Sequence, residues 1–104
     1  MLDIARNWIS PASVKRNIDA MGFNKLNVMR LHATDSQSWP LEVPSIPSLA
    51  EKGAYDKNKI WSVKDVQDVQ NHGLYRGVEV ILEIDMPGHT GSIVHSRPDL
   101  VVGW

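Results

Sequence analysis

Cysteine is absent from this chain of 104 residues, and so are long apolar runs and an excess of charge of either sign. Without cysteine no disulfide can form, and thiols give no information on the redox compartment. No stretch approaches the roughly 20 apolar residues of a membrane-spanning helix, so no membrane span is expected. The net charge is -1, from 11 basic and 12 acidic side chains. There is neither the basic stripe typical of nucleic-acid binding nor the acidic tail typical of disorder.

The N-terminus shows no recognisable export signal, because residues 1–3 (Met-Leu-Asp) open neither a basic segment nor an apolar one. Hydrophobic residues make up 42% of the chain and charged residues 22%, as in ordinary globular proteins. No low-complexity segment or linker divides the sequence. We therefore expect a single structural unit, either one small domain or part of a larger one.

Five segments carry a secondary-structure signal. Apolar and β-branched runs predict strands at residues 1–6, 26–32 and 78–84. A helix is predicted over residues 11–21 from the spacing of apolar residues, and a second over residues 63–76. Strands that alternate with helices in this way indicate right-handed crossovers and a parallel sheet, and hence an α/β fold.

Both predicted helices carry start and stop signals. Ser10 stands before a proline at the first helical position, and Gly22 is placed to end that helix. Ser62 and Asp65 form the signature of a capping box before the second helix, and Gly77 follows its end. We expect the helices to begin and end at these residues.

The segment between the second strand and the second helix, residues 33–61, contains three of the six prolines. We expect an irregular loop here, and a loop of this length in a compact domain is more often functional than incidental. Trp39 and Trp61 lie near its ends. Their rings could stack on a sugar, but we favour packing, because large aromatic side chains dominate burial.

The strongest functional signal is residues 83–89, Glu-Ile-Asp-Met-Pro-Gly-His, at the end of the third predicted strand. Two carboxylates and an imidazole stand there beside a Pro-Gly turn. Polar groups also follow the other two strands, and in a parallel sheet all three ends lie on one side, where α/β folds build their sites. The six side chains expected to converge are Asp3, Arg6, His32, Asp35, Asp85 and His89.

Several kinds of chemistry are compatible with such a cluster. An aspartate beside a histidine can orient the imidazole, which can then tune a third, acidic group. No serine or cysteine in a strained elbow accompanies them, so a Ser-His-Asp hydrolase is poorly supported. The four histidines show no HExxH or similar spacing, so no metal is predicted, although Asp85 and His89 could supply two ligands to an unseen site.

The sequence resembles the catalytic domain of the β-N-acetylhexosaminidases of glycoside hydrolase family twenty. The resemblance covers essentially the whole chain and rests on four motifs in the family's order, residues 2–7, 25–38, 53–55 and 83–90. Residues 34–42 and 75–80 are especially similar to fungal members. The resemblance implies a partial TIM (β/α)8 barrel, with about three parallel strands and two to three crossover helices, so that residues 1–104 form a fragment of a single catalytic domain.

The same resemblance implies an activity that needs no cofactor. The family removes terminal N-acetylglucosamine or N-acetylgalactosamine from glycans and chitin oligomers, with retention of configuration. The mechanism is substrate-assisted: the 2-acetamido oxygen of the sugar attacks the anomeric carbon, a glutamic acid protonates the leaving oxygen, and a neighbouring aspartate orients the acetamido group.

Family roles carry over to five positions. Arg6 matches the arginine that holds the hydroxyls of the terminal sugar, a task suited to its fork of donors. Asp35 and His89 match the pair that tunes the proton affinity of the acid. Asp85 matches an aspartate close to the sugar, and His32 a residue that supports the pocket.

Two departures from the family pattern stand out. Ser36 occupies a position where many members have aspartate. The fungal pattern has serine there, as this chain does. No Asp-Glu dipeptide occurs in the chain, whereas the family carries this catalytic pair after the next strand, beyond Trp104. We therefore expect that the 104-residue chain alone does not hydrolyse glycosides.

Two other interpretations stay open. The chain could be a non-catalytic fragment that binds sugar or associates with itself through open sheet edges. It could also belong to a different barrel hydrolase with a coincidental strand-end motif. For the full-length enzyme the resemblance implies the secretory pathway or the extracellular space, with the export signal upstream of Met1.

Overall fold

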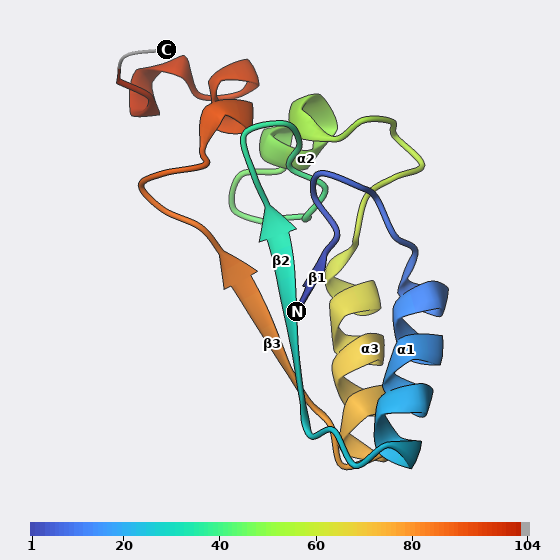
Figure 1. The fold of residues 1–104 in the computed structure, drawn as a ribbon. Coiled ribbons are helices and arrows are strands. Elements are labelled where there is room, and N and C mark those ends of the chain that lie inside the picture. The colour runs from blue at the N-terminus through green and yellow to red at the C-terminus, as the bar shows by residue number, and fades with distance from the viewer. Residues whose placement is uncertain (103–104) are drawn as a thin grey trace.

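Three parallel strands form the sheet of this protein, whose computed structural model describes residues 1–102 (Figure 1). They lie in the order β1-β2-β3, so that β1 and β3 are the edges. The strands are β1 (Leu2–Asp3), β2 (Val28–Thr34) and β3 (Glu79–Ile84). The helices are α1 (Pro11–Phe23), α2 (Ser48–Gly53) and α3 (Val63–Leu74), followed by the 3-10 turns η1 (Gly91–His95) and η2 (Pro98–Leu100).

One face of the sheet is covered by helices and the other is not. Helices α1 and α3 lie side by side against the same face (Figure 1). Met29, Leu31 and Ala33 of β2 point into this layer and are buried, while Val28 before them and Arg30 between the first two are exposed. This alternation is the period of two that a strand imposes on its side chains. The apolar core therefore lies between β2 and the two helices.

The predicted helix starts are confirmed. The Ser10 side chain accepts a hydrogen bond from Ser13 N at 3.2 Å. At α3, Ser62 Oγ accepts from Asp65 N at 3.1 Å, and Asp65 Oδ2 accepts from Ser62 N at 2.9 Å, which completes the capping box. Gly77 after α3 has φ +69°, the left-handed conformation that favours glycine.

The predicted end of the first helix is wrong. Gly22 lies inside α1, and the left-handed residue is Lys25, with φ 59°. Lys25 N donates to Gly22 O at 3.3 Å, and Leu26 N donates to Met21 O at 3.0 Å. These two bonds form a Schellman motif. Because they satisfy the last carbonyls of the helix, α1 ends there and not at the glycine.

The loop prediction is also partly wrong, because residues 33–61 contain the short helix α2. Its prolines do not prevent this, since Pro47 stands at the N-cap, where proline is tolerated. Trp39 and Trp61 are 3% and 0% exposed. Each indole N–H donates to a backbone carbonyl, at 3.0 Å. The two tryptophans are therefore packing anchors of this segment, as favoured above.

Strand β1 is shorter than the predicted segment 1–6. Asp3 Oδ1 accepts from Ala5 N and Arg6 N, each at 3.0 Å, which bends the chain away from the sheet. Strand β2 is shifted two residues along the chain from the predicted range 26–32.

None of the helices that the structure describes is long and apolar enough to cross a bilayer.

Candidate active site

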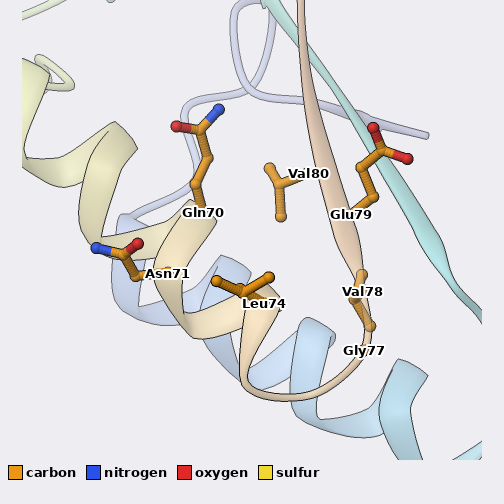
Figure 2. A pocket seen from close by; sticks show the side chains of 7 residues that line it. All are labelled: Gln70, Asn71, Leu74, Gly77, Val78, Glu79 and Val80. Atoms are coloured by element: carbon orange, nitrogen blue, oxygen red, sulfur yellow. The ribbon is translucent and has the colours of Figure 1, made fainter.

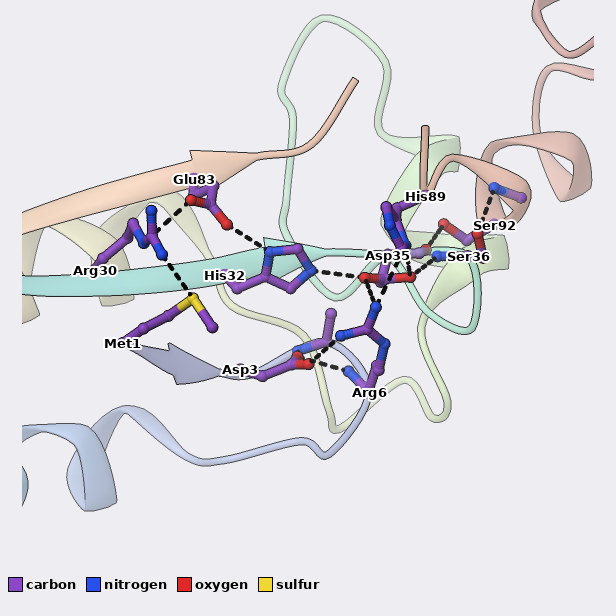
Figure 3. A network of polar contacts seen from close by, with 12 residues as sticks. Met1, Asp3, Arg6, Arg30, His32, Asp35, Ser36, Glu83, His89 and Ser92 are labelled. Atoms are coloured by element: carbon purple, nitrogen blue, oxygen red, sulfur yellow. Dashed lines mark hydrogen bonds and ion pairs between the residues drawn. The ribbon is translucent and has the colours of Figure 1, made fainter. Parts of the chain in front are cut away.

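The carboxyl ends of the three strands bring most of the predicted site residues together (Figure 3). Asp3 and Arg6 belong to β1 and the turn after it, and His32 lies in β2. Asp35 follows β2 directly, and His89 reaches the same place from the loop after β3. Because the strands are parallel, residues more than 80 positions apart meet at one edge of the sheet.

Asp35 is the centre of this cluster and is 0% exposed. Its Oδ2 lies 2.7 Å from Arg6 Nη2 and 2.7 Å from His32 Nε2. Its Oδ1 accepts from Ser36 N at 2.7 Å and lies 3.2 Å from His89 Nδ1. Both oxygens of this buried carboxylate are thus occupied, as burial of a charge requires.

The pKa of Asp35 reflects two opposing effects. Burial raises the pKa of this carboxyl, but its partners, with the hydrogen bond from His32 foremost, outweigh burial and bring the pKa below its ordinary value of 3.8. Asp35 is therefore ionised at neutral pH. Nδ1 of the half-exposed His89 lies 3.2 Å from this carboxylate and 3.3 Å from Arg6 Nη2. A proton on Nδ1 satisfies the carboxylate and leaves Nε2 of the ring for another group.

Arg6 is held from two sides and still faces solvent. Its Nη1 donates to Asp3 Oδ2 at 3.0 Å, and its Nη2 pairs with Asp35. Tyr55 Oη donates to the backbone carbonyl of Arg6 at 3.0 Å. The side chain stays 45% exposed. Because a guanidinium has five N–H donors, donors remain for a ligand while the position of the group is fixed.

The loop that carries His89 is tied to the loop that carries Asp35. Ser92 Oγ donates to Asp35 O at 2.5 Å, and Gly91 N donates to Ser36 Oγ at 3.3 Å. A Cβ at position 91 would lie 3.2 Å from Ser36 Cβ, so glycine allows this close approach. Ser36 thus joins the two loops through its hydroxyl.

Similarity to known proteins agrees with this geometry. A sequence model of the glycosyl hydrolase family 20 catalytic domain matches residues 1–104. The chain belongs to this family. A beta-hexosaminidase of Arthroderma benhamiae is 55% identical over 103 residues, which are 99% of this chain and 17% of that protein. A chitooligosaccharidolytic beta-N-acetylglucosaminidase of Bombyx mori is 47% identical over 91 residues, 88% of this chain and 15% of that protein.

Solved structures of family 20 share the fold. The exo beta-N-acetylglucosaminidase of Vibrio harveyi, in complex with N-acetylglucosamine, has a TM-score of 0.88 and 32% identity, covering 99% of this chain and 19% of that one. The chain therefore spans less than a fifth of the length of these relatives. The prediction of a partial TIM barrel is confirmed, and the uncovered sheet face corresponds to the interior of a complete barrel.

One predicted site residue stands apart in this family 20 fragment. Asp85 follows β3 and is half-buried, and it makes no hydrogen bond or ion pair within residues 1–102. The structure does not bring it into the cluster around Asp35. Its role beside the sugar stays a prediction.

Sequence reasoning counted Glu83 in the motif of residues 83–89 but did not include it among the six side chains expected to converge. Its Oε1 lies 2.7 Å from His32 Nδ1, and its Oε2 lies 3.2 Å from Arg30 Nε. The available signal was its place at the end of the strand, as the first of the two carboxylates in the motif. His32 and Glu83 are register partners on neighbouring strands, so their side chains lie on the same face.

Neither a metal site nor a hollow competes with this cluster. Among the residues that the structure describes, no group of three or more His, Asp or Glu side chains could hold a metal ion. A mainly apolar hollow lies between α3 and the start of β3, far from the carboxyl ends of the strands (Figure 2). It is lined by Gln70, Asn71, Leu74, Gly77, Val78, Glu79 and Val80.

Proposed function

We propose that this chain is the N-terminal part of the barrel of a β-N-acetylhexosaminidase, acting on glycans and chitin oligomers that end in N-acetylglucosamine or N-acetylgalactosamine. The observation that supports this most is the buried Asp35 carboxylate, whose two oxygens are shared between a half-exposed arginine and a half-exposed imidazole. An arginine and an imidazole at one strand edge suit the binding of sugar hydroxyls and the tuning of a neighbouring acid. The printed activities of the relatives agree with this assignment.

Each residue has a task that its surroundings suit. Arg6 binds hydroxyls of the terminal sugar with the donors that Asp3 and Asp35 leave free. Asp35 keeps His89 in one tautomer, and Nε2 of this ring then acts on the catalytic acid. His32 supports Asp35. Asp85 lies on the same strand end and serves the sugar site.

The acid itself comes from outside this chain, because no Asp-Glu dipeptide occurs among the 104 residues. In this proposal Arg6 binds the sugar, Asp35 and His89 set the proton affinity of the acid, and the remaining barrel supplies the group that protonates the leaving oxygen.

We place the complete enzyme in the secretory pathway or outside the cell. A tagged full reading frame found in the culture medium of its host would support that location, and retention in the cytosol would contradict it.

A chimera tests the assignment directly. The 103 residues of this chain that match the Arthroderma benhamiae relative replace the corresponding segment of that protein, which is 55% identical there. The chimera is expected to release the aryl group from an aryl N-acetyl-β-glucosaminide. Asp35→Asn and His89→Ala should each lower kcat by about 100-fold, within the range for a group assisting proton transfer.

Asp68→Asn is the matched control, since Asp68 lies on the outer surface of α3 and pairs only with the exposed Lys64 within residues 1–102. The Asp68→Asn chimera should have the same kcat as the chimera without this substitution. A folded chimera without activity, beside an active parent, would refute the proposal. So would equal rates for the Asp35 and Asp68 variants.

A further inference from the structure

His32 lies between two carboxylates, and its hydrogen bonds require a proton on each ring nitrogen. Nδ1 is 2.7 Å from Glu83 Oε1, and Nε2 is 2.7 Å from Asp35 Oδ2 (Figure 3). An ionised carboxylate only accepts hydrogen bonds, and a neutral imidazole has one donor. A neutral His32 would turn a lone pair toward one of the two carboxylates. Because the pKa values of Asp35 and Glu83 are both lowered, the two carboxylates are ionised, and this geometry then favours an imidazolium.

Glu83 is itself held in position to accept the hydrogen bond from Nδ1 of His32. It is the register partner of His32 across the β2–β3 pair, so both side chains stand on the uncovered sheet face. While its Oε1 meets His32, its Oε2 lies 3.2 Å from Arg30 Nε. Both oxygens of Glu83 are engaged, and the arginine on β2 holds the carboxylate in place.

The charges around His32 balance only when its ring is protonated. From β1 it faces Asp3, from the loop after β2 it faces Asp35, and from β3 it faces Glu83. Behind these three carboxylates stand Arg6, which pairs with Asp3 and Asp35, and Arg30, which pairs with Glu83. Three negative and two positive charges leave one negative charge over, and the imidazolium of this 6% exposed residue neutralises it.

We propose that Glu83 and His32 form a positioning pair for the reaction, in which Glu83 keeps His32 charged and His32 keeps Asp35 turned toward His89. This inference rests on the proposed function and adds two residues that act through Asp35. Oδ2 of Asp35 is saturated by the cations of Arg6 and His32, so Oδ1 is left for His89. Neither Glu83 nor His32 needs to touch the sugar.

The pair predicts a particular pH dependence. The hydrogen bond to Glu83 is the largest influence that raises the pKa of His32 above its ordinary value of 6.5, followed by that to Asp35. In wild type the ring therefore keeps its proton to a higher pH than an ordinary histidine does. Glu83→Gln keeps the shape and an acceptor oxygen but removes the charge, so the ring loses its proton at lower pH.

The chimera described above is the system for the kinetic test. Near pH 5, where His32 is charged in either case, Glu83→Gln should keep kcat within about twofold of the parent chimera. Near pH 7.5 its kcat should be lower by about tenfold, because a smaller fraction of His32 keeps its proton there. KM should change little, because neither residue contacts the sugar. A defect in folding would lower activity equally at both values of pH.

Glu79→Gln is the matched control, since Glu79 lies on the same strand and face, four residues earlier, and is exposed. Its pH profile should follow that of the parent. Parallel profiles for Glu83→Gln and the parent would overturn the proposal. A profile of Glu79→Gln that falls in the same way would also overturn it.

A second measurement separates this inference from the proposed function. In the 104-residue chain, the ring resonances of His32 can be titrated by NMR in wild type and Glu83→Gln. The midpoint for His32 should fall in Glu83→Gln and should stay at the wild-type value in Glu79→Gln. An unchanged His32 midpoint would overturn the pair even if the chimera is active. An inactive wild-type chimera would refute the proposed function and leave the titration to decide whether Glu83 charges His32.

Discussion

At the scale of single residues, the site depends on a buried carboxylate whose charge is compensated from four directions. Taking such a group out of water is costly, and the cost is met only when each oxygen finds donors. Asp35 achieves this with two cationic side chains, one backbone N–H and one imidazole. The same contacts that stabilise its charge also orient it, so stability and the proposed catalytic role depend on the same atoms.

The stability of the chain should therefore have a maximum between pH values of about 4 and 6.5. The pKa values of Asp3 and Asp35 are lowered in the fold, so their contribution is present above the ordinary value of 3.8 and is lost as the pH falls through the folded values. The pKa of His32 is raised, so its contribution is present below 6.5 and is lost as the pH rises through the folded value.

Urea unfolding of the 104-residue chain between pH 3 and pH 8 measures this profile. Asp35→Asn should reduce the loss of stability at both the acid and the alkaline end of the profile. The substitution removes the titrating carboxyl of Asp35 and, with it, a hydrogen-bond partner of His32. Asp56→Asn, at an exposed loop position, should leave the profile unchanged. An Asp35→Asn profile that overlays that of wild type would contradict the argument.

At the scale of elements, the ends of the helices follow hydrogen-bond geometry more than residue type. Helix α1 passes Gly22 and ends in a Schellman motif with Lys25 in the left-handed conformation. A residue with a Cβ pays roughly 1 kcal/mol for that conformation. Helix α3, in contrast, is followed by Gly77, which adopts it without strain.

Lys25→Gly should thus raise the free energy of unfolding by about 0.5 to 1 kcal/mol, because strain in the folded state exceeds the extra chain entropy of glycine. Lys15→Gly in the middle of α1 is the matched control and should lower it by about 1 kcal/mol. Chemical denaturation at neutral pH measures both. A loss of stability in Lys25→Gly equal to that in Lys15→Gly would show that the conformation at position 25 carries no strain.

At the scale of the whole molecule, the chain is a barrel segment with one sheet face and two sheet edges uncovered. The uncovered face bears Arg30, His32 and Glu83, which in a complete barrel of the family point inward. The edges β1 and β3 carry backbone groups that can pair with another strand. These features explain why the segment holds only part of a site, and they lead us to expect self-association through the strand edges.

The isolated 104-residue chain is expected to release no aryl group from an aryl N-acetyl-β-glucosaminide above the buffer background. Binding of N-acetylglucosamine in the millimolar range, lost in Arg6→Ala, would show that the sugar subsite survives in the fragment. Absence of binding together with strong self-association in sedimentation would identify a structural fragment instead. Hydrolysis by the purified chain would contradict the assignment of the acid to residues beyond it.

Local signals in the sequence were enough for much of this protein. The strands, both helix starts, the parallel order and the meeting of Arg6, Asp35 and His89 could be predicted, because periodicity, capping and the direction of parallel strands act over short distances or follow from topology. The family motifs added the fold and the activity class.

Only the tertiary structure decided which groups pair. Glu83 meets His32 through the register of two strands about 50 residues apart in the chain, and a pattern within one strand does not contain that register. Asp85, two residues further, would share the face of Glu83 in a continued strand, but β3 ends at Ile84 and the chain leaves the sheet there, so Asp85 stays outside the cluster. The sequence by itself determined which elements form, and packing between distant segments determined where the charges lie, since each pairing energy depends on distances that no local pattern sets.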